Sequence, residues 1–391
     1  MFCSVTNLTR LHSSLLDKTT EFAQDLSPAL LKNLIAIGCA ILVKETVNLN
    51  KLKNQIGTLL GNQQTQVDSH YRRLTRFFDS PIVQRKLWKW LLVWMVGYIK
   101  RWDGRSMSIY LTLDATCWQF GRQPIQLLVL CLVYRGVSLP LFWIDLAKKG
   151  HSNQQERKAL LKQAMKLYPL NGFCLLGDRE YEGKEWFKFL TDNGLHFIIR
   201  LPQQAYKDAI SAGGRSYGSL LRRALRGRLV GQFVHIERYR YQFVALCHQQ
   251  GPQHSDPLVL LLSNTHWSKR QIADRYRLRW TTECFFKHLK SNGFGLEELG
   301  LQSLAKIRVL VAIVLVLYVI CVAEGFRQFR RIRPKKKQLE VFLARESVFR
   351  RGYSVVANQL TTIEHFTDWL MAQLIKPLKV PIRLYFFNVQ Y

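Results

Sequence analysis

The chain has 391 residues, 48% of them hydrophobic, which is enough to fill the core of more than one domain. It is therefore predicted to fold and not to be intrinsically disordered. The 57 Lys and Arg side chains outnumber the 27 Asp and Glu and leave a formal net charge of +30 at pH 7. This excess indicates a polyanionic partner, although a ribosomal or membrane-surface protein would share it, because charge reports on partners and not on fold.

Cysteine usage and the apolar runs indicate a cytoplasmic protein that binds no membrane. The eight cysteines are scattered, without a Cys-x-x-Cys pair or a histidine at zinc-ligand spacing. No basic segment followed by an apolar run and a cleavage site opens the sequence, so we expect no secretory signal. The most apolar run, 309–323, falls short of the roughly 20 residues that cross a bilayer and predicts a buried helix.

Residues 1–105 show few strand-like alternations and predict an α-helical front domain. Within it, 51–60 and 64–78 are expected to form two helices joined by a Gly-Asn turn. This pair resembles a helix-turn-helix unit, whose second helix would lie in a major groove; an ordinary helical hairpin with a solvated basic face remains the alternative. The basic side chains in question are Arg72, Arg73 and Arg76.

From residue 108 the sequence changes to short segments rich in strand formers, separated by turns. The predicted strands are 108–114, 125–134, 139–143, 174–177 and 196–201, with helices at 154–168 and 183–193. Strands followed by helix and strand predict a mixed α/β sheet.

Residues 203–257 interrupt this order with a loop-rich, basic and aromatic stretch, in which 231–246 alternates like a hairpin. The apolar strand 258–263 follows and completes a segment of residues 203–263. We interpret the segment as a β-rich insertion. Ser268 is a suitable N-cap for the long helix expected after it. The run from Arg330 to Lys337 resembles a basic linker.

Two acidic side chains stand where predicted strands end. Asp114 follows Leu111-Thr112-Leu113, and Asp178 follows Leu175-Leu176-Gly177. Strand ends share one edge of a sheet, where the ligand sites of open α/β folds gather. Each aspartate alone is weak evidence, since aspartate at a strand end also begins turns.

The helix after Ser268 carries a third carboxylate among basic and phenolic side chains. Successive spacings of 3, 4 and 7 residues place four side chains on one helical face, and these are Tyr276, Arg279, Glu283 and Lys290. Such a face suits a site that holds a divalent metal and phosphates. A surface helix with an Arg279–Glu283 ion pair is the alternative.

These residues resemble the YREK signature, Tyr276-x2-Arg279-x3-Glu283-x6-Lys290, of DDE transposases of bacterial insertion sequence family 4. The segments Leu113-Asp114-Ala115-Thr116 and Gly177-Asp178-Arg179-Glu180-Tyr181 resemble the first and second carboxylate motifs of that family. The resemblance covers about residues 45–325, and a β-rich insertion before the glutamate is a further family feature.

The resemblance implies a ribonuclease H-like core in which Asp114, Asp178 and Glu283 bind two Mg²⁺ ions, with Mn²⁺ as a substitute, and perform cut-and-paste transposition. Tyr276, Arg279 and Lys290 would hold DNA phosphates, and Lys287 shares their face. The implied partners are double-stranded terminal inverted repeats, target DNA and a second copy of the chain in the DNA complex. A bacterial, nucleoid-associated location follows.

The domains predicted on this basis are 1–105, helical and DNA-binding; 106–202, the first part of the core; 203–263, the insertion; 264–325, the catalytic helix and the buried helix after it; and 326–391, a basic and helical C-terminal region.

One position departs from the family. Relatives that form a DNA hairpin carry a stacking Trp in the insertion, where this chain has Val259. Trp267 and Tyr239 are possible substitutes, although an aromatic side chain there is more often packed in the core.

Two other functions remain open: a ribonuclease H-like nuclease without strand transfer, and a DNA-binding regulator derived from a transposase. The front domain and the basic insertion favour a transposase over a simple nuclease. The intact acidic set argues against a regulator that has lost catalysis.

Overall fold

The computed structural model describes residues 27–102, 109–120, 123–146, 148, 150–247, 257–332 and 346–360. Most of the predicted basic linker, the part from 333 to 337, lies outside these residues. The described chain divides into two compact units, one made of 27–102, 117–126 and 284–360, the other of 109–116 and 127–283. The domain boundaries expected from the sequence remain predictions.

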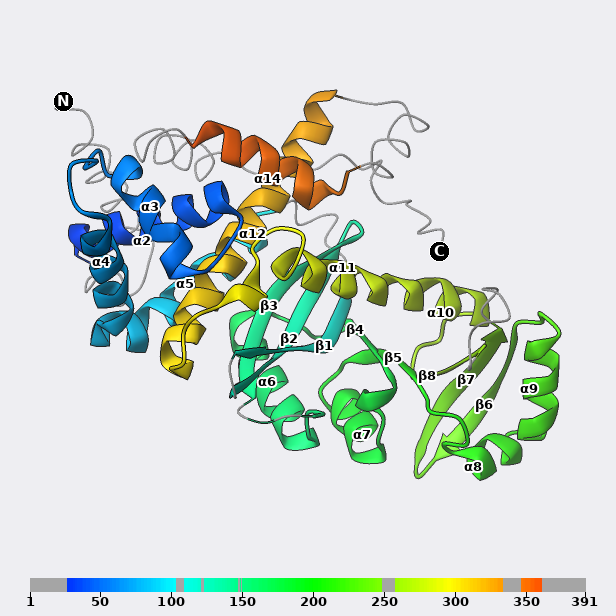
Figure 1. Ribbon diagram of the computed structural model, residues 1–391. Helices are drawn as coiled ribbons and strands as arrows, with labels where there is room; N and C mark the ends of the chain where they lie inside the picture. Colours follow the sequence, from blue (N-terminus) through cyan, green and yellow to red (C-terminus); the bar gives the residue numbers. More distant parts are fainter. Residues whose placement is uncertain are drawn as a thin grey trace. The chain divides into compact units, whose positions relative to one another are not determined.

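An eight-stranded mixed sheet runs through the second unit, in the order β3-β2-β1-β4-β5-β8-β7-β6 (Figure 1). The strands are β1 (Tyr110–Phe120), β2 (Gln123–Tyr134), β3 (Val137–Leu146), β4 (Cys174–Gly177), β5 (His196–Arg200), β6 (Val230–Ile236), β7 (Tyr239–Cys247) and β8 (Leu258–Ser263). β1, β4 and β5 are parallel neighbours, and β5, β8, β7 and β6 are joined antiparallel. The mixed α/β fold predicted from the sequence is confirmed, and it is consistent with a ribonuclease H-like core.

Helices cover both faces of this sheet. On one face lie α6 (Gln154–Leu167) and α7 (Lys184–Asp192), and on the other α10 (Lys269–Tyr276) (Figure 1). All four residues of β4 are consequently buried, which explains its continuous apolar sequence. Ile272 of α10 packs in a core cluster with side chains of β4, β5, β7 and β8.

The insertion continues the core sheet. Its strands β6 and β7 form the predicted hairpin, with Gly231 paired to Val244 and Ile236 to Tyr239, and β8 joins that hairpin to β5. The loop-rich interpretation of its first part was wrong, because two short helices form there, α8 (Lys207–Ala212) and α9 (Tyr217–Leu225). Ser216 caps the second of them by accepting the Ser219 amide.

The long helix expected after Ser268 is not continuous. Ser268 does cap α10, in a capping box with Gln271. A 3-10 turn, Arg277–Arg279, then separates α10 from α11 (Trp280–Leu289). We call residues 269–283 the helical arm. The tighter turn changes the angular step per residue, so the spacing of side chains along the arm departs from that of one ideal α-helix.

Apart from the end of β1 and the start of β2, the first unit is helical. It contains α2 (Pro28–Lys44), α3 (Leu49–Leu59), α4 (Val67–Asp79), a π-helical turn (Val83–Leu87), α5 (Trp88–Lys100), α12 (Leu304–Ile332) and α14 (Val348–Gln359). The front helices do not form a core alone, because α2 and α5 also pack against α12. α12 is long and apolar enough to cross a membrane, but its most apolar stretch is completely buried within the protein, as expected for a core helix. It extends well beyond the apolar run that predicted it.

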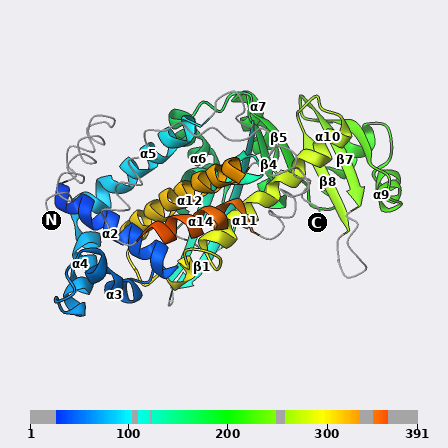
Figure 2. The same ribbon diagram turned by 90° about the horizontal axis from the view of Figure 1, so that it is seen from above.

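Two glycines allow α12 and α14 to pack closely (Figure 2). A Cβ atom on Gly352 would lie 1.8 Å from the Cys321 carbonyl oxygen and 2.5 Å from the Gly325 nitrogen. A Cβ on Gly325 would lie 1.9 Å from the Val348 carbonyl oxygen. These atoms belong to the backbone, so a larger residue at either glycine must push the helices apart.

Gly352→Ala is expected to lower the free energy of unfolding by about 1–3 kcal/mol or more, since overpacking against backbone forces the helices to separate. Urea denaturation would measure the loss. Gly97→Ala in α5 is the control, because its Cβ would meet nothing within 4 Å and alanine favours helix over glycine. An equal loss in both variants would contradict the close packing.

Candidate functional site

Three polar side chains on one face of β1 point toward the helical arm. Tyr110, Thr112 and Asp114 alternate along the strand and therefore point to the same side. The Tyr110 hydroxyl accepts a hydrogen bond from Arg275, and Asp114 contacts Arg279. The sequence predicted that the strand ends at Asp114. This was wrong, because β1 continues to residue 120.

The register of the parallel strands sets Asp114 level with Asp178. β1 pairs with β4 as Tyr110 with Cys174 and Thr112 with Leu176, an offset of 64 residues. The same offset leads from 114 to 178, just beyond the last paired residues. β4 ends at Gly177, so the Asp178 side chain emerges where its strand stops. The register thus sets the two aspartates side by side, Asp178 at the end of its strand, as the sequence predicted, and Asp114 within β1.

Arg279 links the carboxylate of β1 to that of the helical arm. One guanidinium nitrogen lies 3.3 Å from Asp114 Oδ2, and another donates to Glu283 Oε1. Only 16% of the Arg279 side chain is exposed. Burial by itself lowers the pKa of Arg279, but the Tyr276 phenol and the three carboxylates outweigh burial and raise it. Arg279 is therefore a permanently charged counter-ion at the centre of the acidic group.

Burial is the main cause of the raised pKa of Asp114. Loss of hydration raises its pKa to about 7, and the negative charges of Glu180 and Asp178 add to the rise. The Arg279 charge and the hydrogen bond from the Ala115 amide lower the pKa only in part. Asp114 therefore takes up a proton at a pH where an exposed aspartate is fully ionised.

A buried group of hydroxyls fixes the arm against the sheet. Thr282 donates to Thr112 of β1, and Ser138 of β3 shares hydrogen bonds with Thr281, at 2.7 Å, and with Thr282, at 3.1 Å. The four side chains are nearly inaccessible to solvent. Since Thr282 precedes Glu283 and Thr112 lies two residues before Asp114, this contact sets the spacing of the two carboxylates. The alternation of β1 was visible in the sequence, but its hydroxyl partners were not.

Further polar residues support the acidic group from β4's side. His151 Nδ1 lies 2.7 Å from Glu180 Oε2, and the Glu180 charge acts on Asp114. The Tyr181 ring is completely buried, and the Arg157 guanidinium lies 4.8 Å from its centroid. Arg157 is itself held by the Ser152 hydroxyl at 2.8 Å. Glu180 and Tyr181 belong to the segment that resembles the second carboxylate motif, but their sequence indicated no role for them. The burial of Arg157, on an amphipathic helix, had no sequence signal either.

The oxygen donors of this group suit a hard divalent cation. Among the residues that the structure describes, no donor reaches the buried Oδ1 atom of Asp178, which leaves a costly unsatisfied acceptor that a cation would satisfy. Yet no three His, Cys, Asp or Glu side chains of the described chain are close enough to hold one ion. The sequence predicted convergence within reach of shared ions. The structure differs because a guanidinium lies between two of the carboxylates.

The other basic residues named from the sequence lie in the first unit. Lys290 donates to the Cys117 carbonyl oxygen at 2.7 Å and lies 3.2 Å from Glu297, and Lys287 is exposed. Their expected place beside Glu283 remains a prediction. Arg72, Arg73 and Arg76 are all exposed on α4, whose apolar side is buried.

The aromatic side chains considered as stacking platforms already have partners. Val259 is buried in β8. The Trp267 ring packs on Tyr110 and lies 4.5 Å from the Arg275 guanidinium. Tyr239 donates to Asp192 at 2.7 Å. These contacts are those of packing residues.

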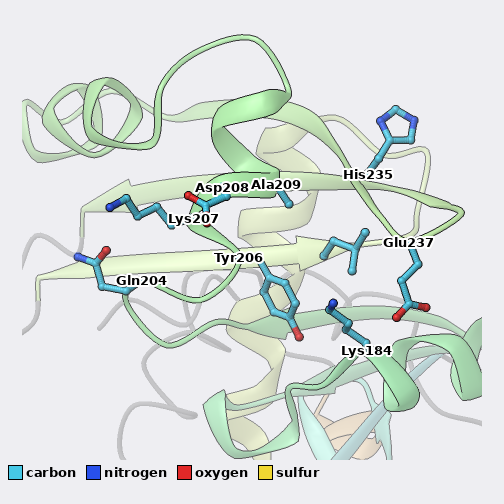
Figure 3. Close-up of a pocket in the computed structure, with 9 residues that line it drawn as sticks. Lys184, Gln204, Tyr206, Lys207, Asp208, Ala209, His235 and Glu237 are labelled. Carbon is cyan, nitrogen blue, oxygen red and sulfur yellow. The ribbon is translucent and has the colours of Figure 1, made fainter.

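A separate pocket of about 410 Å³ opens between the insertion and the start of α7 (Figure 3). Its lining includes Lys184, Tyr206 and Glu237, with the Tyr206 ring directed toward Lys184. None of the three carboxylates contributes to it. Its walls carry charges of both signs, which favour no single class of ligand.

The raised pKa of Asp114 predicts a pH-dependent stability in metal-free buffer. The folded chain holds this proton more tightly than the unfolded chain, so stability should fall as pH rises from about 4 to about 7 and level off above. Asp114→Asn removes that loss. We expect its unfolding free energy, relative to the parent protein, to increase across this window in urea titrations with EDTA. A difference that stays constant with pH would contradict the assignment.

Residues 105–320 match the model of a protein family described as Transposase DDE domain. No curated protein matches the chain. Among solved structures, similarity is found to a piggyBac transposase in a synaptic complex with hairpin DNA, at 11% identity and a TM-score of 0.48, covering 96% of this chain and 80% of the other. The family match spans more than half of the 391 residues and includes Asp114, Asp178 and Glu283, so the chain belongs to the DDE transposase family.

Proposed function

We propose that this transposase moves a bacterial insertion sequence of family 4 by cutting and rejoining DNA with Asp114, Asp178 and Glu283. The observation that carries the proposal is the shared guanidinium of Arg279. It links Asp114 and Glu283, which come from segments 169 residues apart, and its charge also acts on Asp178. A surface helix with a local ion pair would not gather acidic groups from two strands and an arm.

The three carboxylates are proposed to hold two Mg²⁺ ions, or Mn²⁺ in their place. When bound, such ions supply Lewis acidity at the attacking and leaving oxygens of an in-line displacement. The chain itself provides a rigid frame, since the hydroxyl contact of Thr282 with Thr112 fixes Glu283 relative to β1. It also provides a partly dehydrated site, because Asp114 and Arg279 are both mostly buried.

The basic and phenolic residues of the YREK signature are proposed to hold phosphates. Arg279 offers a planar fork that matches phosphate geometry, and the Tyr276 side chain is directed to the same site, where its pKa is raised by burial and by the charge of Asp178. Lys287 and Lys290 would extend this contact along the DNA backbone. These side chains position the strand, and the carboxylates act on it.

The terminal inverted repeats are proposed to bind the front helices. α3 and α4 are joined by a turn in which Gly61 has a φ of 66°, and α4 exposes three arginines. Such a pair can place its second helix in a major groove. Two copies of the chain would join the two ends and the target, at the nucleoid of a bacterial cytoplasm.

Glu283→Gln should abolish cleavage of a labelled duplex that carries the inverted repeat flanking the gene, with Mg²⁺ present. It should leave end binding intact or slightly tighter in a gel-shift assay with Ca²⁺, because it removes a metal ligand and a negative charge beside phosphate.

Glu185→Gln is the matched control, since Glu185 is an exposed carboxylate on α7 whose only described ion pair is with Lys158 at 3.8 Å. It should cleave normally. Normal cleavage by Glu283→Gln would refute the three-carboxylate mechanism, and cleavage without joining to target DNA would assign the chain to the nucleases.

The double variant Arg72→Ala/Arg73→Ala should weaken binding to the same duplex. It should also reduce the slope of log affinity against log salt by about 2, since each lost phosphate contact removes roughly one released counterion. Binding isotherms at several salt concentrations measure the slope. Lys188→Ala, on an exposed face of α7, serves as the control, and an unchanged slope in the double variant would make α4 a structural helix.

A further inference from the structure

Arg279 lies between Asp114 and Glu283, where metal ions are proposed to bind. Its guanidinium lies 3.3 Å from Asp114 Oδ2 and donates to Glu283 Oε1. The third carboxylate, Asp178, has a buried oxygen that no donor of the described residues reaches. Arg279 therefore contacts two of the three acids directly.

The same guanidinium cannot serve two purposes at once. A cation between Asp114 and Glu283 would meet the positive charge of Arg279 at contact distance in a partly buried site, where repulsion is strong. The N–H groups turned toward the two carboxylates are also unavailable to a phosphate, because a guanidinium presents its donors in one fixed plane. Binding of the ion and release of the arginine are consequently linked.

We propose that Arg279 is the internal counter-ion of the metal-free site: it holds Asp114 and Glu283 until divalent ions displace it, and only then does it bind a DNA phosphate. This inference rests on the proposed function and adds a regulation to it. The arginine stabilises the acidic group when no metal is bound. It also weakens binding of the first ion, and its transfer to phosphate couples metal loading to DNA binding.

The helical arm is suited to such a transfer. Arg279 is the last residue of the 3-10 turn, where hydrogen bonding is less regular than in the α-helices on either side. Arg275, one turn earlier, is instead fixed by Tyr110 and Trp267. The carboxylate frame stays in place through the hydroxyl contacts of Thr281 and Thr282, so the guanidinium can move while Glu283 does not.

The test is a titration of the full-length, DNA-free protein with Mn²⁺, with free Mn²⁺ measured by electron paramagnetic resonance. Arg279→Gln should bind the first ion about tenfold or more tightly than the parent protein, as expected for removal of one competing charged hydrogen bond. Arg275→Gln is the matched control, because it removes an equal charge from the same arm without touching a carboxylate. It should bind Mn²⁺ as the parent does.

A second measurement uses DNA. In gel-shift assays with a short duplex, Arg279→Gln should weaken binding in Ca²⁺ but not in EDTA, where the arginine is held by the carboxylates. Arg279→Lys keeps the charge without the planar fork and should give intermediate Mn²⁺ affinity, which provides a test should the glutamine variant not fold.

The outcomes separate the inference from the function on which it rests. Asp178→Asn should lose Mn²⁺ binding while the parent retains it. If it does, and Arg279→Gln binds Mn²⁺ no more tightly than the parent, the counter-ion role is wrong and the metal site stands. An equal gain in Arg275→Gln would likewise overturn the role, since any lost charge would then suffice. If the parent binds no more Mn²⁺ than Asp178→Asn, the three-carboxylate function itself fails.

Discussion

Ionised carboxylates in a small, partly dehydrated volume repel one another unless a cation or a proton neutralises them, and this constraint governs the acidic site. Asp114, Asp178 and Glu283 come from two strands and a helical arm, and their mutual repulsion would separate those elements. Arg279 prevents this by contacting Asp114 and Glu283 from within the group. Burial is the largest cause of the raised pKa of Asp114, and the negative charges of Glu180 and Asp178 add to it.

Backbone geometry brings the charges to this point. Parallel pairing of β1 and β4 sets the two aspartates level, and the buried hydroxyls of Thr112, Thr282 and Ser138 fix the arm on the sheet. Neutral hydroxyl contacts suit this purpose because they tolerate a change of charge nearby. The proposed exchange of a guanidinium for metal ions would need a frame that depends on neither.

The insertion shows how a core sheet can be enlarged without creating a new domain. β8 pairs with β5 and β7 with β8, so the added hairpin continues the hydrogen-bonded ladder of the core. α10, which begins the helical arm, then packs across strands of both origins through Ile272. The start of the arm is thus packed on several strands, and one short 3-10 turn separates α10 from the helix that carries Glu283.

The local sequence was enough to predict most of the helices and strands, and to single out Asp114, Asp178 and Glu283 as candidate site residues. Alternation and apolar runs located the strands, Ser268 and Gln271 marked the start of α10, and the spacing from Tyr276 to Glu283 singled out the arm. These are local properties, which neighbouring residues encode. Tertiary structure alone decided that β1 continues past Asp114, that the insertion extends the core sheet, and that Arg279 reaches Asp114 as well as Glu283. Each of these depends on strand register and helix placement between segments far apart in the chain, which no local pattern records.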